Sequence, residues 1–251
     1  MELWEYIILF LSVLFGGGAA LLLKKNNKNV LQLVLAFTGA YIMGLSVLHL
    51  MPTVFAEHSH TIGLWVLLGF FVQLLLEQLS SGIEHGHIHV HEHGKRNFAI
   101  QVMIGLCIHA FMEGLPLSGY EDLHMHVHSH DHAHFGGGGN FLLFGIIMHK
   151  IPAAFALGLL LMLSGFSRLV IFGCLFLFAS MSPLGAAIPQ LLHEGSIEPK
   201  VMNILTAIVV GSFLHIATTI LFEQDSSHQH KIPIKKLAAI GAGIVAAILT
   251  L

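Results

Sequence analysis

Long apolar runs separated by short polar breaks dominate this chain. The breaks carry Lys, Asn, His, Gly and Pro, as water-exposed loops do. Because a helix needs about 20 mostly apolar residues to cross a bilayer, each run predicts one membrane span. Eight spans are expected, at residues 4–23, 30–52, 61–82, 97–118, 140–163, 168–191, 201–223 and 233–251. The pattern predicts an all-α polytopic membrane protein, with residues 1–251 forming one transmembrane domain.

Lys and Arg are distributed unevenly among the breaks, which predicts the orientation of the spans. The breaks on one side hold Lys24, Lys25, Lys28, Lys95, Arg96, Arg168, Lys231, Lys235 and Lys236. The other side holds Lys200 alone, and Lys150 lies inside a span. Because cytoplasmic loops carry the excess of Lys and Arg, the first group marks the cytoplasmic side. Both termini are then expected outside a cytoplasmic or plasma membrane.

The composition excludes several classes of protein and leaves lipid as one expected partner. The chain is 55% hydrophobic and 10% charged, with a net charge of −3, whereas soluble domains are about 25% charged. An ordinary soluble enzyme, a nucleic-acid-binding protein with a basic face and a disordered chain are therefore ruled out. Cys107 and Cys174 lie inside apolar runs and form no CxxC motif, so neither disulfides nor a thiolate zinc site is expected.

Histidine is the exception to this shortage of polar side chains, with 20 residues. Many of them alternate with other residues in two breaks, an expected cytoplasmic loop at 83–96 and an expected extracytoplasmic His/Gly-rich loop at 120–139. These are His85, His87, His89, His91 and His93, and His124, His126, His128, His130, His132 and His134. Neutral imidazole is a common ligand for zinc, copper and nickel, which favours metal capture by both loops. The alternative is a solvated linker, since alternating His defines no single tetrahedral site.

Ionisable residues inside the expected spans carry the strongest functional signal, because a charge in hydrocarbon is costly. His109 and Glu113 are four residues apart, so they share one face of the fourth span. His149 and Lys150 lie near the middle of the fifth span. Imidazole and carboxylate together suit a divalent cation. The alternative is a hydrogen-bonded pair within one helix and no metal.

Three prolines accompany these residues, namely Pro116, Pro152 and Pro183. Proline removes a backbone hydrogen bond and is tolerated at membrane depth where the backbone lines a cavity. We therefore expect three interrupted helices around the polar cluster, as in an ion pathway. His49 and His215 each stand alone on an apolar face and are expected to be hydrogen-bonded packing residues.

Four segments resemble signature sequences of the ZIP metal transporter family. The fourth-span segment HAFMEG (109–114) resembles the family's HNxxEG, and HKIPAA (149–154) resembles its fifth-span HExPHE or HNxPEG. SPLGA (182–186) and HLMP (49–52) resemble the sixth-span EPLGA and the second-span HLLP. The resemblance covers the whole chain. It implies a divalent-metal importer, most often for zinc, in which spans one, four, five and six form a transport bundle. Spans two, three, seven and eight would form a scaffold, often dimeric.

The resemblance implies a primary metal site at His109, Glu113 and His149. It also implies what is missing: the bridging Glu of the fifth span and the ligands of a second metal. The positions expected to lack ligands are Ala110, Lys150, Ala154 and Ser182. We therefore expect one intramembrane metal, with the Lys150 ammonium replacing the charge of the second. Alternatively, Lys150 points out of the site.

These features together favour import by alternating access, with Zn²⁺ or another divalent cation as substrate and not as a catalytic cofactor. No catalytic residues are assigned and no nucleic-acid partner is expected. One alternative is a metal-dependent intramembrane hydrolase, although the chain contains no HExxH motif. Another is a metal sensor that binds tightly without transport.

Overall fold

The structure is a computed structural model that describes residues 1–22, 28–56, 61–80, 95–119, 138–192, 198–222 and 233–250. Within these ranges the chain is helical and has no strand, which confirms the expected all-α class. The long helices are α1 (Leu3–Leu22), α2 (Lys28–Leu45), α4 (Ile62–Ser80), α5 (Lys95–Gly114), α7 (Gly138–Leu163), α8 (Arg168–Leu192), α9 (Pro199–Phe222) and α10 (Ile234–Ile248). The short segments η1 (Ser46–Leu50) and α3 (Met51–Phe55) continue α2, and η3 (Leu115–Ser118) follows α5.

Seven helical segments of the described ranges are long and apolar enough to cross a membrane. They are Leu3–Leu22, Val30–Phe55, Ile62–Leu79, Arg96–Ser118, Phe141–Leu163, Arg168–Pro189 and Pro199–Phe222. Large apolar side chains such as Phe15, Phe71 and Phe176 are exposed on their outer faces, where lipid would contact them. The chain is therefore a multi-pass membrane protein.

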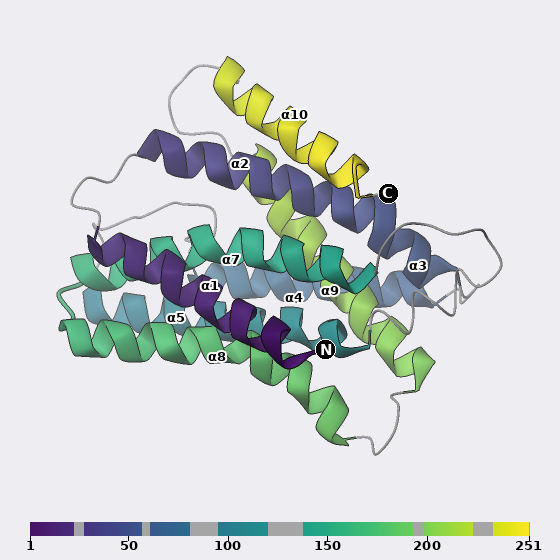
Figure 1. Cartoon of the computed structure of the whole chain (residues 1–251), viewed down its shortest axis with the longest axis horizontal. Helices are drawn as coiled ribbons and strands as arrows, with labels where there is room; N and C mark the ends of the chain where they lie inside the picture. The colour runs from purple at the N-terminus through teal and green to yellow at the C-terminus, as the bar shows by residue number, and fades with distance from the viewer. Residues whose placement is uncertain are drawn as a thin grey trace.

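The helix at the eighth expected span, α10, is shorter than the others. It has 15 residues, or about 22 Å at 1.5 Å per residue, against a hydrocarbon core of about 30 Å. It lies along α2 (Figure 1), where a Cβ on Gly243 would meet the Phe37 carbonyl oxygen at 2.3 Å. The eighth crossing stays a prediction.

Glycines bring three other pairs of helices into backbone contact. In α1, a Cβ on Gly16 would lie 2.3 Å from the Ile151 carbonyl oxygen of α7. In α8, a Cβ on Gly185 would lie 2.1 Å from the Phe111 carbonyl oxygen of α5. In α9, a Cβ on Gly211 would lie 1.9 Å from the Val66 carbonyl oxygen of α4. Such approach is how membrane helices associate, since lipid provides no hydrophobic drive between them.

One hydrophobic core cluster is built entirely from α1, α5, α7 and α8. Val13 of α1, Leu106 of α5, Leu157 of α7 and Leu175 of α8 belong to it, and all four are buried. These four helices therefore pack around a common apolar centre, and α5 also contacts α4.

Only one of the three prolines interrupts a helix. Pro116 lies in η3, just after α5 ends at Gly114, whereas Pro152 and Pro183 lie inside the continuous helices α7 and α8. The expectation of three interrupted helices is therefore wrong for α7 and α8.

Both helices pack closely against a neighbour beside their prolines. The residue before Pro152 is Ile151, whose carbonyl faces Gly16, and the residue before Pro183 is Ser182, whose carbonyl faces Gly114. Proline frees the carbonyl four residues earlier, and membrane helices tolerate such a residue inside a continuous helix where surrounding protein covers the backbone.

Gly185 should tolerate no side chain, because the carbonyl of Phe111 occupies the space. We expect Gly185→Val to lower thermal stability in detergent, since overpacking costs about 1–3 kcal/mol or more. Gly173→Val on the same helix is the matched control, because a Cβ there meets nothing within 4 Å. Equal melting temperatures for both variants would contradict the α5–α8 packing.

Candidate metal site

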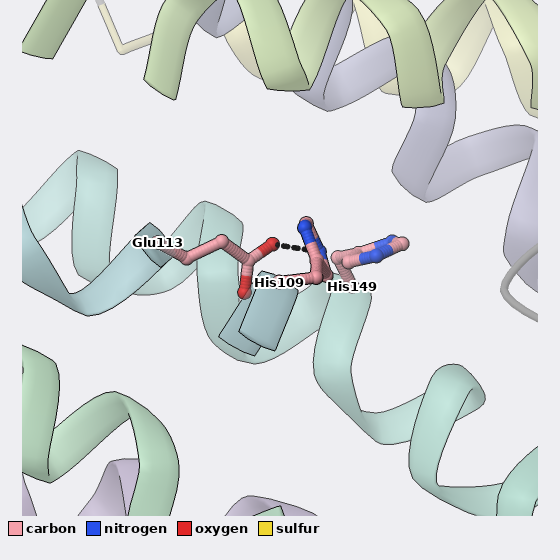
Figure 2. A group of neighbouring side chains, drawn as sticks. All are labelled: His109, Glu113 and His149. Atoms are coloured by element: carbon pink, nitrogen blue, oxygen red, sulfur yellow. Dashed lines mark ion pairs between the residues drawn. The ribbon is translucent and has the colours of Figure 1, made fainter. Parts of the chain in front are cut away.

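Three buried side chains that can bind metal converge between α5 and α7. His109 and Glu113 come from α5 and His149 from α7 (Figure 2). One ligand atom from each residue lies within 4.8 Å of the others. Among the described residues they form the one group of three or more His, Cys, Asp or Glu that is close enough to share an ion. The two imidazole rings are nearly perpendicular, with centroids 6.0 Å apart.

His109 and Glu113 contact each other directly. Their spacing of four residues puts His109 Nε2 2.7 Å from Glu113 Oε1, the dashed contact in Figure 2. The pair within one helix, which the sequence left open as an alternative, is thus present, and His149 adds a third side chain that can bind metal from a second helix. A tetrahedral zinc ion keeps its ligand atoms roughly 3.3 Å apart, given Zn–N distances of about 2.0 Å. The direct contact would therefore open to admit the ion.

Lys150 points into this cluster. Its Nζ donates to Glu113 Oε2 at 2.7 Å, and its side chain is 2% exposed. The same ammonium lies 5.4 Å from the centroid of the Phe178 ring on α8. Glu113 therefore has a partner on each oxygen, His109 on Oε1 and Lys150 on Oε2. The Glu113 carboxylate and the π-face of Phe178 together stabilise the charge of Lys150 away from water.

The remaining positions expected to lack ligands are closed by packing. The Ser182 hydroxyl donates to the Ala110 carbonyl oxygen at 2.6 Å, which joins α8 to α5. Ala110 and Ala154 are fully buried in the apolar cluster of α1, α5, α7 and α8. These contacts fill the region with a hydroxyl, two methyl groups and an ammonium.

Two further polar residues lie directly behind His109, and neither was among the site residues predicted from the sequence. Gln73 of α4 places its Oε1 2.9 Å from His109 Nδ1. Ser212 of α9 donates its hydroxyl to the same oxygen at 2.9 Å. The only sequence signal was a polar residue within an apolar run. Nothing in the sequence relates residue 73 to residue 109 or 212, which come from three different helices.

The two histidines expected to be packing residues differ from each other. His49 Nε2 lies 3.1 Å from Thr250 Oγ1, so a hydrogen-bonded packing histidine is confirmed there. His215 Nε2 pairs with Glu77 of α4, and the ring packs edge-on against Phe70. A hydrogen-bonded packing histidine is therefore confirmed here too, and its partner is a carboxylate that the glycine contacts of α4 with α9 bring beside it.

The alternating histidines of the loops at 83–96 and 120–139 lie outside the described residues. Metal capture by these loops stays a prediction.

Comparison with known proteins agrees with the signature sequences. A profile of the ZIP zinc transporter family matches residues 83–250, more than half of the chain. Zinc transporter ZIP9-B of Xenopus laevis is 27% identical over 187 residues, 70% of this chain and 58% of the relative. Zinc transporter ZIP9 of Micropogonias undulatus is 26% identical over 186 residues, 69% of this chain and 57% of the relative. Protein zntD of Dictyostelium discoideum is 29% identical over 159 residues, 59% of this chain and 21% of the relative.

Fold and site thus define an all-helical, multi-pass membrane protein with buried side chains that can bind metal. This chain belongs to the ZIP zinc transporter family. It spans less than three fifths of the length of the ZIP9 relatives that it matches.

Lys150 and Glu113 should depend on each other for stability. We expect Lys150→Met to lower the melting temperature in detergent, because it leaves a buried carboxylate short of one partner. Breaking a buried ion pair costs about 3–5 kcal/mol. Lys150→Met/Glu113→Gln should recover much of the loss, and Lys200→Met, at an exposed position of α9, should change little. Additive losses in the double variant would show that the two residues do not stabilise each other.

Proposed function

We propose that this protein imports a divalent metal ion, zinc in the first place, through one intramembrane site. The observation that carries the proposal is the buried convergence of His109, Glu113 and His149 from two helices of a ZIP-family protein. The ligand set of two imidazoles and one carboxylate suits zinc and leaves a fourth position for water or cargo exchange. The metal is the substrate, so the protein is a transporter and not an enzyme. The ZIP9 relatives are named zinc transporters.

The packing supports alternating access as the mechanism. α1, α5, α7 and α8 share one apolar cluster and carry all three proposed ligands, so they suit a bundle that moves as a unit. α2, α4, α9 and α10 would form the scaffold, with α4 facing the site through Gln73. Movement of the bundle would open the site first to one side of the membrane and then to the other.

In this proposal, the Lys150 ammonium supplies the positive charge that a second metal ion would otherwise supply. In family members with two adjacent ions, carboxylates bridge them. Here the ammonium of Lys150 lies 2.7 Å from Glu113 Oε2 and supplies a fixed positive charge. It offsets the carboxylate charge in low dielectric and competes with the cargo for that carboxylate. The cargo is therefore held more weakly than by a bridging carboxylate, which favours its release.

The import direction in this proposal rests on the orientation that the distribution of Lys and Arg predicts. With the basic loops in the cytoplasm, the loop at 120–139 lies outside and concentrates metal at the entrance. The loop at 83–96 lies inside and accepts the ion as it leaves. Neither loop provides a fixed site, since alternating imidazoles exchange metal among many positions.

Removal of a single ligand should abolish uptake. We expect His109→Ala and Glu113→Ala to reduce Zn²⁺ uptake into proteoliposomes to the background of empty vesicles. Gel filtration should show folded protein in both cases. His49→Gln is the control, since it replaces a histidine that packs against Thr250 away from the three ligands. Wild-type uptake by both alanine variants would refute the site, and tight zinc binding without flux in the unaltered protein would favour the sensor.

A crystal soaked in zinc should contain one intramembrane ion. We expect a single anomalous peak between His109, Glu113 and His149, because the neighbouring positions provide an ammonium, a hydroxyl and two methyl groups in place of the oxygen ligands of the family pattern. Lys150→Glu/Ser182→Glu, which adds two carboxylates, should admit a second ion beside the first. Two intramembrane peaks in the unaltered protein would refute the role of Lys150.

A further inference from the structure

We propose that Gln73, held by Ser212, is a positioning residue that keeps His109 in the form able to bind metal. The inference rests on the proposed function, because it concerns a ligand of the proposed metal site. Gln73 acts on the far nitrogen of one imidazole, and Ser212 acts on Gln73.

The hydrogen bonds around the Gln73 side chain determine which nitrogen of His109 carries hydrogen. The Gln73 side-chain oxygen accepts from the Ser212 hydroxyl and lies 2.9 Å from His109 Nδ1. Because an amide oxygen can only accept, His109 Nδ1 must be the donor. Because Nδ1 keeps its hydrogen, Nε2 is the nitrogen that offers a lone pair to the proposed metal, once the metal replaces the hydrogen that joins Nε2 to Glu113 Oε1.

The oxygen of Gln73, and not its amide nitrogen, faces His109, and Ser212 bonds the same oxygen. A reversed amide would donate to Nδ1, move the hydrogen to Nε2 and block the lone pair that metal needs. The Ser212 hydroxyl donates to the oxygen and so adds a second hydrogen bond to the orientation that the structure contains. Gln73 and Ser212 are both buried, at 1% and 2% exposure, so water does not compete with these bonds.

The support behind His109 is rigid because α4 and α9 are in backbone contact around it. Gly69 lies one turn before Gln73 and meets the Ile208 carbonyl oxygen, and Gly211 immediately precedes Ser212. Partners of a metal-binding histidine that fix its tautomer typically change metal affinity about 10–100-fold when they are removed. The hydrogen bond also joins α5 of the proposed bundle to α4 of the proposed scaffold. The affinity of His109 for metal therefore depends on the position of the bundle. Once α5 has moved away from Gln73, this hydrogen bond is lost and the site binds metal more weakly.

The test compares acceptor and non-acceptor side chains at residue 73 by Zn²⁺ flux into proteoliposomes. Gln73→Leu should raise KM about 10–100-fold with little change in the maximal rate. Gln73→Glu, which keeps an acceptor oxygen, should retain a KM near that of the unaltered protein. Asn203→Leu is the matched control: Asn203 is also a buried polar residue of the scaffold, and it bonds the Val54 carbonyl instead of a ligand. Its KM should not change.

A second measurement separates positioning from general destabilisation. In the His109→Ala background, Gln73→Leu should cause no further loss of equilibrium zinc affinity, because its effect passes through His109. Ser212→Ala, which removes one hydroxyl, should raise KM several-fold and serves if Gln73→Leu fails to fold. An unchanged KM in Gln73→Leu or Ser212→Ala would overturn this inference, as would failure of Gln73→Glu to restore KM. Those results would leave the metal site intact if His109→Ala still abolishes flux, whereas flux in His109→Ala would refute the proposed function itself.

Discussion

Glu113 is a carboxylate with 1% exposure inside a membrane protein, and the polar interior is arranged around that one charge. A charge at this depth is expensive unless each oxygen has a partner. His109 contacts one oxygen from within α5, and Lys150 contacts the other and so joins α7 to α5. In our proposal, a metal ion enters by taking over one of these contacts. The same carboxylate therefore stabilises the empty protein and, in our proposal, binds the cargo.

The helix packing serves this arrangement by bringing backbones close together where side chains would keep them apart. Gly185 and Gly114 bring α8 against α5, so that Ser182 can donate to the Ala110 carbonyl oxygen. Gly16 brings α1 against α7 at the turn that precedes Pro152. Because the hydrophobic effect does not drive helices together in lipid, the close packing of small residues stabilises these contacts. Polar side chains between the helices are thus held in fixed positions.

Lys150 distinguishes this member of the family from the two-metal arrangement that the signature sequences imply. An ammonium provides positive charge permanently and cannot be transported, whereas a second metal ion could leave. The neighbouring changes agree with it, because Ala110 and Ala154 add no charge and the hydroxyl of Ser182 is used within the fold. In our proposal, one fixed cation and one mobile cation share a single carboxylate.

The sequence by itself determined the all-α membrane class, seven spans that the structure bears out, and the family. These follow from local information: apolar runs of sufficient length, and signature segments whose residues lie within one helix, such as His109 and Glu113. The continuous course of α7 and α8 through their prolines is seen only in the tertiary structure, where Gly16 and Gly114 of other helices pack beside them.

The ion pair of His215 with Glu77 and the support of His109 by Gln73 and Ser212 were likewise decided only by tertiary structure. Each of these contacts joins residues far apart in the chain. No periodicity along one segment encodes which face of α4 meets α5 and which meets α9. That choice depends on how the glycines of three helices fit together in space.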